Sequence, residues 1–328
     1  MFLYLNEELN DMNEKSIILE VKSGSFLYGT NTESSDVDQL GIFIPPIEEE
    51  LGLFCEKEID LSIGQKDENN KNTADCVDRK FYHLKKFILL ASQNNPNILE
   101  LLYPSRESII SISPVGEYLL LHRDIFLHKG LVTRFLNYAK SQKHKMIIKT
   151  EKFTELNEML DFLKEVAKET PKMYLSELKY HKEFLKIGKE NIQPDGIKMG
   201  DLFFPFNIFV KEAIKRISKR IENGTHRQDL ILKYGFDCKF ASHLIRLLYE
   251  AIELLELNQL NFPLKEADLI LEIKKGNMSL DQILDLSESL EKRITELEIL
   301  SELPNEPDMI KINNLMVDLF KHHYKMEE

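Results

Sequence analysis

The chain has 328 residues, of which 43% are hydrophobic, so it is long enough for two domains and can bury a sizeable core. Its formal net charge of -12 argues against a protein that coats nucleic acid non-specifically, because that activity usually needs a broad basic surface; a local basic groove is still compatible with this charge. The sequence shows neither a signal peptide nor an apolar stretch of about 18 residues, so secretion and membrane spanning are not expected.

The cysteines favour a reducing compartment. Cys55, Cys76 and Cys238 are odd in number, widely spaced and form no Cys-x-x-Cys pair. This usage is typical of reduced thiols that act as small hydrophobic residues. We therefore expect a cytoplasmic protein.

The N-terminal part is predicted to mix strands with helices. A strand rich in apolar and β-branched residues ends at the small residues 23–25, and a second strand is stopped by Pro45 and Pro46. In chain order, the predicted elements are a polar helix near 6–13, strands over 16–22, 36–44 and 73–80, and a polar surface loop or lid over 64–72.

The rest of the chain is predicted to be helical, because apolar residues recur there at the spacing of one helix face. Ser279 and Gln282 form a predicted capping box, and Gly276 stands where a helix ends. The predicted helices are 83–92, 98–103, 116–127, 131–147, 151–168, 176–188, 207–222, 238–257, 264–275 and 280–300.

Two short patterns in the N-terminal part suggest a site for a nucleoside triphosphate and its metals. Asp36 and Asp38 are separated by one residue, so in a strand both carboxylates lie on one face and can coordinate divalent cations. Gly24 and Ser25 form a turn without bulky side chains, where backbone N–H groups and the Ser25 hydroxyl can approach phosphate oxygens. Each pattern alone is common in bends and solvated edge strands, but their order along the chain favours a function.

A third carboxylate is needed for the chemistry that these patterns indicate. Phosphoryl and nucleotidyl transfer use two cations, and hard oxygen ligands suit Mg²⁺ or Mn²⁺. Asp75 and Asp78 lie on the next predicted strand, and because they are three residues apart they face opposite sides. Only one of them can point toward the site.

The segment from Gly24 to Asp38, GSFLYGTNTESSDVD, resembles the signature of the DNA polymerase β-type nucleotidyltransferase superfamily. The nearest branch looks like the predicted nucleotidyltransferases associated with RNA-repair systems. Polar Ser23 and Gln39 depart from the superfamily pattern, which prefers apolar residues there. The resemblance spans nearly the whole chain and is supported downstream by segments 84–87, 95–102, 137–142, 235–248 and 303–307.

The resemblance implies an α/β (α+β) nucleotidyltransferase module with a mixed sheet over 1–110, followed by a large all-helical domain over 111–328. It implies that Gly24 and Ser25 hold the triphosphate and that Asp36 and Asp38 bind two Mg²⁺ or Mn²⁺ ions. Asp78 would be the third ligand, because it precedes the Tyr-x-Leu-Lys-Lys-Phe run as the acidic residue of the family does, with Asp75 as its substitute.

Lys239, His243 and Arg246 follow the spacing i, i+4, i+7 and share one face of a predicted helix. The spacing alone favours a solvated basic stripe, whereas the resemblance favours contacts with the triphosphate or with an acceptor strand. His243 has a further interpretation as a core residue bonded to backbone. Tyr138 is a candidate for stacking on a base, although such a tyrosine more often packs between helices.

Two acidic features are given structural interpretations. Glu100 is expected to satisfy backbone donors near a helix start, and the run Glu48 to Glu50 is expected to be ordinary solvated charge. Neither is assigned to the site.

The sequence therefore predicts an enzyme that transfers a nucleoside monophosphate from a nucleoside triphosphate to a hydroxyl, with an RNA end as the favoured acceptor. Two alternatives stay open. One is a nucleotide- or RNA-binding module on the same fold without turnover, and the other is nucleotidyl transfer to a protein hydroxyl. The sequence carries no signal for base preference or oligomeric state.

Overall fold

The computed structural model describes residues 17–32, 35–62, 77–188, 191–222, 231 and 233–326. The predicted helix near 6–13, the loop 64–72 and Asp75 lie outside these residues. The chain forms two compact units, one made of residues 1–139, 245–271 and 286–328, the other of residues 140–244 and 272–285. The predicted boundary after residue 110 stays a prediction.

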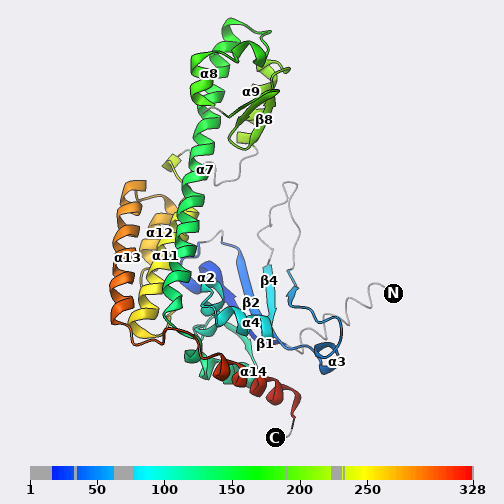
Figure 1. The fold of residues 1–328 in the computed structure, drawn as a ribbon, viewed down its shortest axis with the longest axis vertical. Coiled ribbons are helices and arrows are strands. Elements are labelled where there is room, and N and C mark those ends of the chain that lie inside the picture. The colour runs from blue at the N-terminus through cyan, green and yellow to red at the C-terminus, as the bar shows by residue number, and fades with distance from the viewer. Residues whose placement is uncertain are drawn as a thin grey trace. The chain divides into compact units, whose positions relative to one another are not determined.

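The first unit contains a five-stranded mixed sheet, as predicted, with the strand order β3-β4-β2-β1-β5. Only β2 and β4 pair in parallel, and the other neighbours are antiparallel. The short helix α2 follows β1 directly (Figure 1). The strands are β1 (Ile17–Ser23), β2 (Val37–Phe43), β3 (Glu58–Asp60), β4 (Val77–His83) and β5 (Ile109–Ile112).

One face of this sheet explains how β4 is fixed next to β2. Gly41 on β2 is paired with Glu20 on β1 and with Phe81 on β4. A Cβ at Gly41 would lie 2.5 Å from the Phe81 ring and from the Leu19 carbonyl, so only glycine leaves room for that ring. On the same face, the Arg79 guanidinium donates two hydrogen bonds to Glu20, at 2.6 and 2.9 Å, and so joins β4 to β1 across β2.

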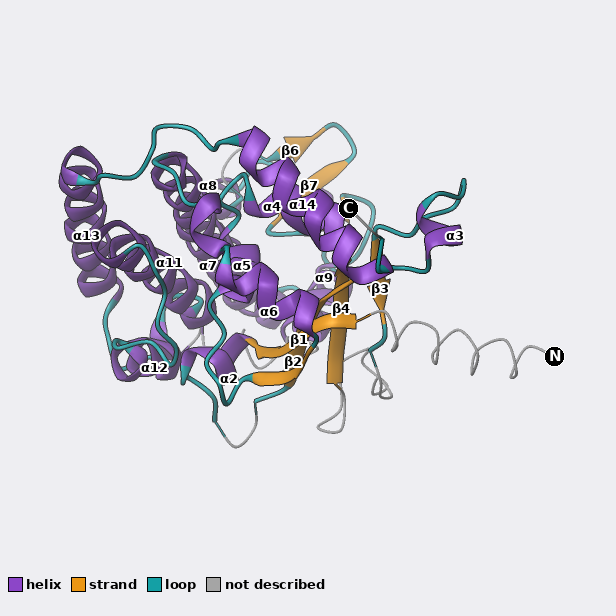
Figure 2. Ribbon diagram, turned by 90° about the horizontal axis from the view of Figure 1, so that it is seen from below, coloured by secondary structure: helices purple, strands orange, loops and turns teal. Residues whose placement is uncertain are grey.

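Helices cover the sheet of the first unit. Helix α14 packs against α6, α4 and the 3-10 helix η2, as Figure 2 shows for α4 and α6. The helices with most of their residues here are α2 (Gly24–Tyr28), α3 (Ile47–Glu50), α4 (Leu84–Ala91), α5 (Pro96–Leu99), η1 (Glu100–Leu102), α6 (Pro114–Leu121), η2 (Arg123–Phe126), α11 (Cys238–Leu257), α12 (Ala267–Lys275), α13 (Leu280–Leu300) and α14 (Met309–Tyr324).

The second unit has its own apolar core around Leu163, Phe184 and Phe204, each fully buried. A small antiparallel sheet, ordered β6-β7-β8, contributes to that core. Helices α7, α11, α12 and α13 contribute residues to both units. The remaining elements are α7 (Gly130–Glu169), η3 (Leu175–Leu178), α8 (Lys182–Ile187), β6 (Ile192–Gln193), β7 (Gly196–Met199), β8 (Leu202–Pro205) and α9 (Val210–Glu222).

The predicted helices are largely confirmed, and those over 238–257 and 280–300 have the predicted bounds. The capping box is also present, because Gln282 N donates to Ser279 Oγ at 3.2 Å and Ser279 N donates to Gln282 Oε1 at 2.8 Å. The predicted helices 131–147 and 151–168 are one continuous helix, α7. In the described part of the chain, no helix is both long and apolar enough to cross a membrane.

The prediction missed several short elements. The strands of the second sheet have two to four residues each, too few for an alternating pattern to stand out from the helical segments around them. It also missed β3, β5, α3 and α14.

Candidate functional site

A row of polar residues crosses the sheet where the predicted ligands lie. Asp38 on β2 is the register partner of Asp78 on β4 and of Ser23 on β1. Register partners on neighbouring strands point to the same face and are about 5 Å apart. Asp36 directly precedes β2 and, two residues before Asp38, is on the same side of an extended chain. The strand pairing thus brings the three predicted metal ligands to one face of the sheet, at the N-terminal ends of β2 and β4.

Gly24 begins α2 in the left-handed region, with φ of 62°. A Cβ at Gly24 would lie 2.5 Å from Asp38 Oδ2, so the Asp38 carboxylate lies directly against the backbone at the start of α2. Ser25 follows in the first turn of α2 and is partly exposed. The predicted phosphate turn and the predicted metal ligand are therefore neighbours in space as well as in sequence.

The three carboxylates suit Mg²⁺ or Mn²⁺ in their donor chemistry and strand placement. In the described part of the chain, their oxygens do not all lie within 4.8 Å of one another, so the side chains as they lie do not form one closed cage. Neighbouring carboxylates repel, and rotation about their side-chain bonds separates the oxygens. The strand register brings the backbones of Asp38 and Asp78 side by side, and the binding of two ions at this row stays a prediction.

A buried ionic network holds the other end of α2. The Tyr28 hydroxyl donates to Glu100 Oε2 at 2.7 Å, and the Arg246 guanidinium lies over the Tyr28 ring, 4.2 Å from its centroid. Arg246 also pairs with Glu100 and with Glu250, the latter at 2.7 Å. Because Tyr28 is the last residue of α2, these contacts fix the helix that begins at Gly24 to η1 and α11.

The network shifts the protonation equilibria of its members. Burial raises the pKa of the Tyr28 hydroxyl well above its usual range. Burial acts to lower the pKa of Arg246, but the Glu250 carboxylate, Tyr28 and Glu100 outweigh it, so that pKa is raised. Burial raises the pKa of Glu250 to about 8, although Arg246 opposes the shift. Two carboxyl groups, those of Glu100 and Glu250, thus share one guanidinium.

The expectation of an exposed stripe of Lys239, His243 and Arg246 is wrong for Arg246, which is 4% exposed. The spacing on the helix could not show that Glu100 packs against this turn of α11 and supplies a counterion. Glu100 is structural, as expected, but it accepts from Tyr28 and Arg246 rather than from backbone donors. Lys239 is exposed and His243 half-buried on the first turns of α11, in the second unit, and their contact with a nucleotide stays a prediction.

Tyr138 on α7 contacts Asn95 and lies near Tyr82 on β4. Its hydroxyl accepts a hydrogen bond from Asn95 Nδ2 at 3.1 Å. Burial, Glu58 and the neighbouring Tyr138 raise the pKa of Tyr82, which is four residues along β4 from Asp78. Four residues of strand correspond to about 13 Å, so base stacking by Tyr138 stays a prediction that this placement allows.

Sequence reasoning missed Tyr28, Glu250 and the pair of Glu20 with Arg79. A signal existed for Glu250, since Arg246 and Glu250 are four residues apart on one helix, the spacing of an ion pair. The other contacts join residues that are 59 or more positions apart and depend on the sheet register and helix packing.

Comparison with known proteins identifies the family. The sequence profile of RlaP, described as the RNA repair pathway DNA polymerase beta family, matches residues 4–318. The chain belongs to this family. It is also similar to an uncharacterized 38.9 kDa protein of the nrdC-mobD intergenic region of Enterobacteria phage T4, 25% identical over 277 residues that cover 77% of this chain and 81% of the relative. No solved structure matches.

Membership of the RlaP family confirms the resemblance found in the sequence and extends over nearly the whole chain. The family description links the protein to DNA polymerase β-type nucleotidyltransferases and to RNA repair.

Replacement of Gly24 by alanine tests the contact between the phosphate turn and Asp38. The new Cβ would meet Asp38 Oδ2 at 2.5 Å, so we expect at least a tenfold loss of Mn²⁺ affinity, measured by electron paramagnetic resonance. Gly235→Ala is the matched control, because Gly235 also has positive φ, 82°, but nothing lies within 4 Å of its Cβ position. Both variants carry about 1–2 kcal/mol of backbone strain. Equal Mn²⁺ affinities in the two would contradict the assignment.

The raised pKa of Glu250 predicts a pH-dependent stability. Below the unfolded-state pKa of about 4.3, Glu250 is protonated in both states and contributes no pH dependence. Between there and about pH 8 the folded state keeps a proton that the unfolded state has released, so the free energy of unfolding falls as pH rises. Glu250→Gln should flatten this slope in urea unfolding curves recorded across the range.

Glu256→Gln changes an exposed carboxylate on the same helix and should retain the wild-type slope. A Glu250→Gln protein whose unfolding free energy follows pH as the wild type does would show that another group titrates.

Proposed function

We propose that this RlaP-family protein transfers a nucleoside monophosphate from a nucleoside triphosphate to a hydroxyl group at an RNA end. The observation that carries the proposal is the pairing of Asp38 with Asp78 on parallel strands, with the Asp38 carboxylate against Gly24. This arrangement supports the proposal because it brings carboxylates suited to divalent cations beside a small-residue turn that can approach phosphate oxygens. The family description supports the reaction class.

In the proposed reaction the acceptor oxygen forms a bond to the α-phosphorus, the bond to pyrophosphate breaks, and the acceptor hydroxyl loses its proton. Gly24 and Ser25 hold the triphosphate through backbone N–H groups and the Ser25 hydroxyl. Asp36, Asp38 and Asp78 are the residues that would hold two divalent cations. When bound, such ions activate the acceptor hydroxyl and neutralise the charge that develops on pyrophosphate.

An RNA acceptor is supported by a local basic surface on a chain of net charge -12. Lys211, Lys215 and Lys219 are four residues apart on α9 and all exposed, whereas Ala213 and Ile217 face the core. None of the three lysines makes an ion pair with the residues that the structure describes, in contrast to Arg216 and Arg220 on the same helix. A lysine row of this kind suits contacts with backbone phosphates.

The test supplies each labelled nucleoside triphosphate with Mn²⁺ and an RNA oligonucleotide that carries a free hydroxyl end. We expect the label on the RNA, and a loss of roughly a hundredfold or more in Asp38→Asn and in Asp78→Asn, because each removes a metal-ligating oxygen charge. Asp285→Asn, at an exposed position of α13, should transfer at the wild-type rate.

Unchanged transfer by Asp38→Asn would reject the proposed site. Binding of a triphosphate with no transfer to any acceptor would instead support a nucleotide-binding module. A parallel reaction with cell lysate separates the remaining alternative, since label found in protein and not in RNA would identify a protein hydroxyl as the acceptor.

A further inference from the structure

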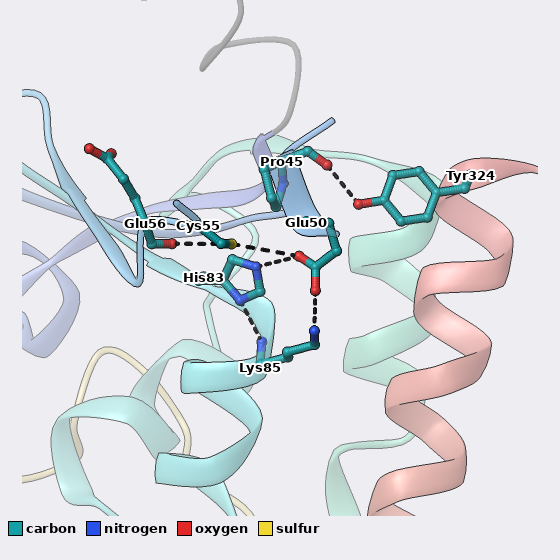
Figure 3. A network of polar contacts seen from close by, with 7 residues as sticks. All are labelled: Pro45, Glu50, Cys55, Glu56, His83, Lys85 and Tyr324. Carbon is teal, nitrogen blue, oxygen red and sulfur yellow. Dashed lines mark hydrogen bonds and ion pairs between the residues drawn. The ribbon is translucent and has the colours of Figure 1, made fainter. Parts of the chain in front are cut away.

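A second cluster of metal-ligating groups lies at the other end of β4 from Asp78. The Glu50 carboxylate, the Cys55 sulfur and the His83 ring point toward one another (Figure 3), and one ligand atom of each lies within 4.8 Å of the others. His83 is five residues along β4 from Asp78, about 16 Å, and faces the opposite side of the sheet. We infer that Glu50, Cys55 and His83 form a binding site for a Zn²⁺-type transition-metal ion, separate from the aspartate row.

The chain builds this cluster from three local features. Glu50 ends α3, and its side chain is only 5% exposed, so the expectation of a solvated acidic run is wrong for this residue. The turn after α3 brings Cys55 back to Glu50 five residues later, with the sulfur 3.9 Å from Glu50 Oε2. His83 is the last residue of β4 and the N-cap of α4, and its side chain is only 4% exposed.

The distances suit a metal ion after a small adjustment. His83 Nε2 lies 2.7 Å and Cys55 Sγ 3.9 Å from Glu50 Oε2. Ligand atoms around a tetrahedral Zn²⁺ are about 3.5 Å apart, given metal–ligand bonds of about 2.0–2.3 Å. A set of one sulfur, one nitrogen and one oxygen prefers Zn²⁺ or Co²⁺ over Mg²⁺.

The hydrogen bonds argue against a nucleophilic cysteine. A cysteine, histidine and acid relay needs the thiol at one ring nitrogen and the acid at the other. Here His83 Nδ1 accepts the Lys85 backbone N–H at 3.1 Å, so both Glu50 and Cys55 gather on the Nε2 side. Burial, together with Glu50 and Glu49, also raises the pKa of the Cys55 thiol, which keeps it protonated and unreactive.

A divalent cation would have the opposite effect on the Cys55 thiol. Its positive charge stabilises the thiolate, and the thiol proton is released to solvent when the ion binds. A metal ion bound at Nε2 requires the ring proton at Nδ1, so binding would end the contact between Nδ1 and the Lys85 N–H. The Lys85 ammonium is paired with the other Glu50 oxygen and would orient that carboxylate as an outer partner.

Three protein ligands leave one position of a tetrahedral ion for water. Cys55 is partly exposed, so this position is open to solvent from the Cys55 side. The Tyr324 hydroxyl nearby donates to the Pro45 carbonyl at 2.7 Å and is therefore already engaged (Figure 3). The fourth position is thus assigned to solvent.

Cobalt spectroscopy on the full chain tests the inference. In a Cys76→Ser, Cys238→Ala background Cys55 is the sole thiol, so a thiolate-to-cobalt absorption band can come from this residue alone. Chelator-treated protein titrated with Co²⁺ should show that near-ultraviolet band together with the visible bands of a tetrahedral ion, saturating at one equivalent. Added Zn²⁺ should remove them.

Further variants separate the cluster from its surroundings. Cys55→Ser should abolish the thiolate band, and Glu50→Gln should weaken Co²⁺ binding at least tenfold. Glu49→Gln, the neighbouring control, and Asp38→Asn, in the aspartate row, should leave the band unchanged. Circular dichroism checks that each variant is folded. In the parent protein, where the cluster is intact, Zn²⁺ should slow the alkylation of Cys55, which tests metal binding without a substitution at the cluster.

Any of three results would overturn the inference. The thiolate band could be absent in the parent protein, it could persist in Cys55→Ser, or Zn²⁺ could fail to slow the alkylation of Cys55.

Discussion

The parallel pairing of β2 with β4 is the constraint on which the candidate site depends. It aligns Asp38 with Asp78, and a slip of one residue would turn Asp78 to the opposite face. The other face of the sheet holds this register, because Phe81 fills the space over Gly41 and the Arg79 guanidinium reaches across β2 to Glu20. An apolar and ionic arrangement on one face therefore positions the candidate metal ligands on the other.

The second support is the buried network at the end of α2. Removing one partner of a buried ion pair leaves an uncompensated charge, typically at a cost of about 3–5 kcal/mol, so Arg246 and Glu100 resist separation. Tyr28 donates a hydrogen bond to Glu100 and is the last residue of α2, so the ion pair restrains this helix of only five residues, which begins at Gly24. The turn at Gly24 thus lies against Asp38 at one end of α2, and Tyr28 at the other end contacts the pair of Arg246 and Glu100, which favours a preorganised site.

The features predicted correctly from the sequence are those that depend on residue spacing and short motifs. The strand ending at the Gly24 turn, the aspartates that follow it and the long helices were all visible in residue spacing, and the family profile confirms the resemblance. Properties that depend on packing between distant segments were not visible. Arg246 shares a helix face with Lys239, yet it is buried and paired with Glu100, 146 residues away. Likewise, the role of Glu50 beside Cys55 and His83 emerges only when β4 and α3 are brought together.

The central claim is that the row of Asp36, Asp38 and Asp78 binds divalent cations beside the turn at Gly24. The most direct measurement is a crystal structure of the protein soaked with Mn²⁺ and a nonhydrolysable nucleoside triphosphate, recorded with anomalous scattering. The account predicts manganese peaks within coordination distance of Asp38 and Asp78 oxygens and phosphate oxygens at the Gly24 and Ser25 backbone. Manganese and triphosphate bound away from this row, with the aspartates uncoordinated, would contradict it.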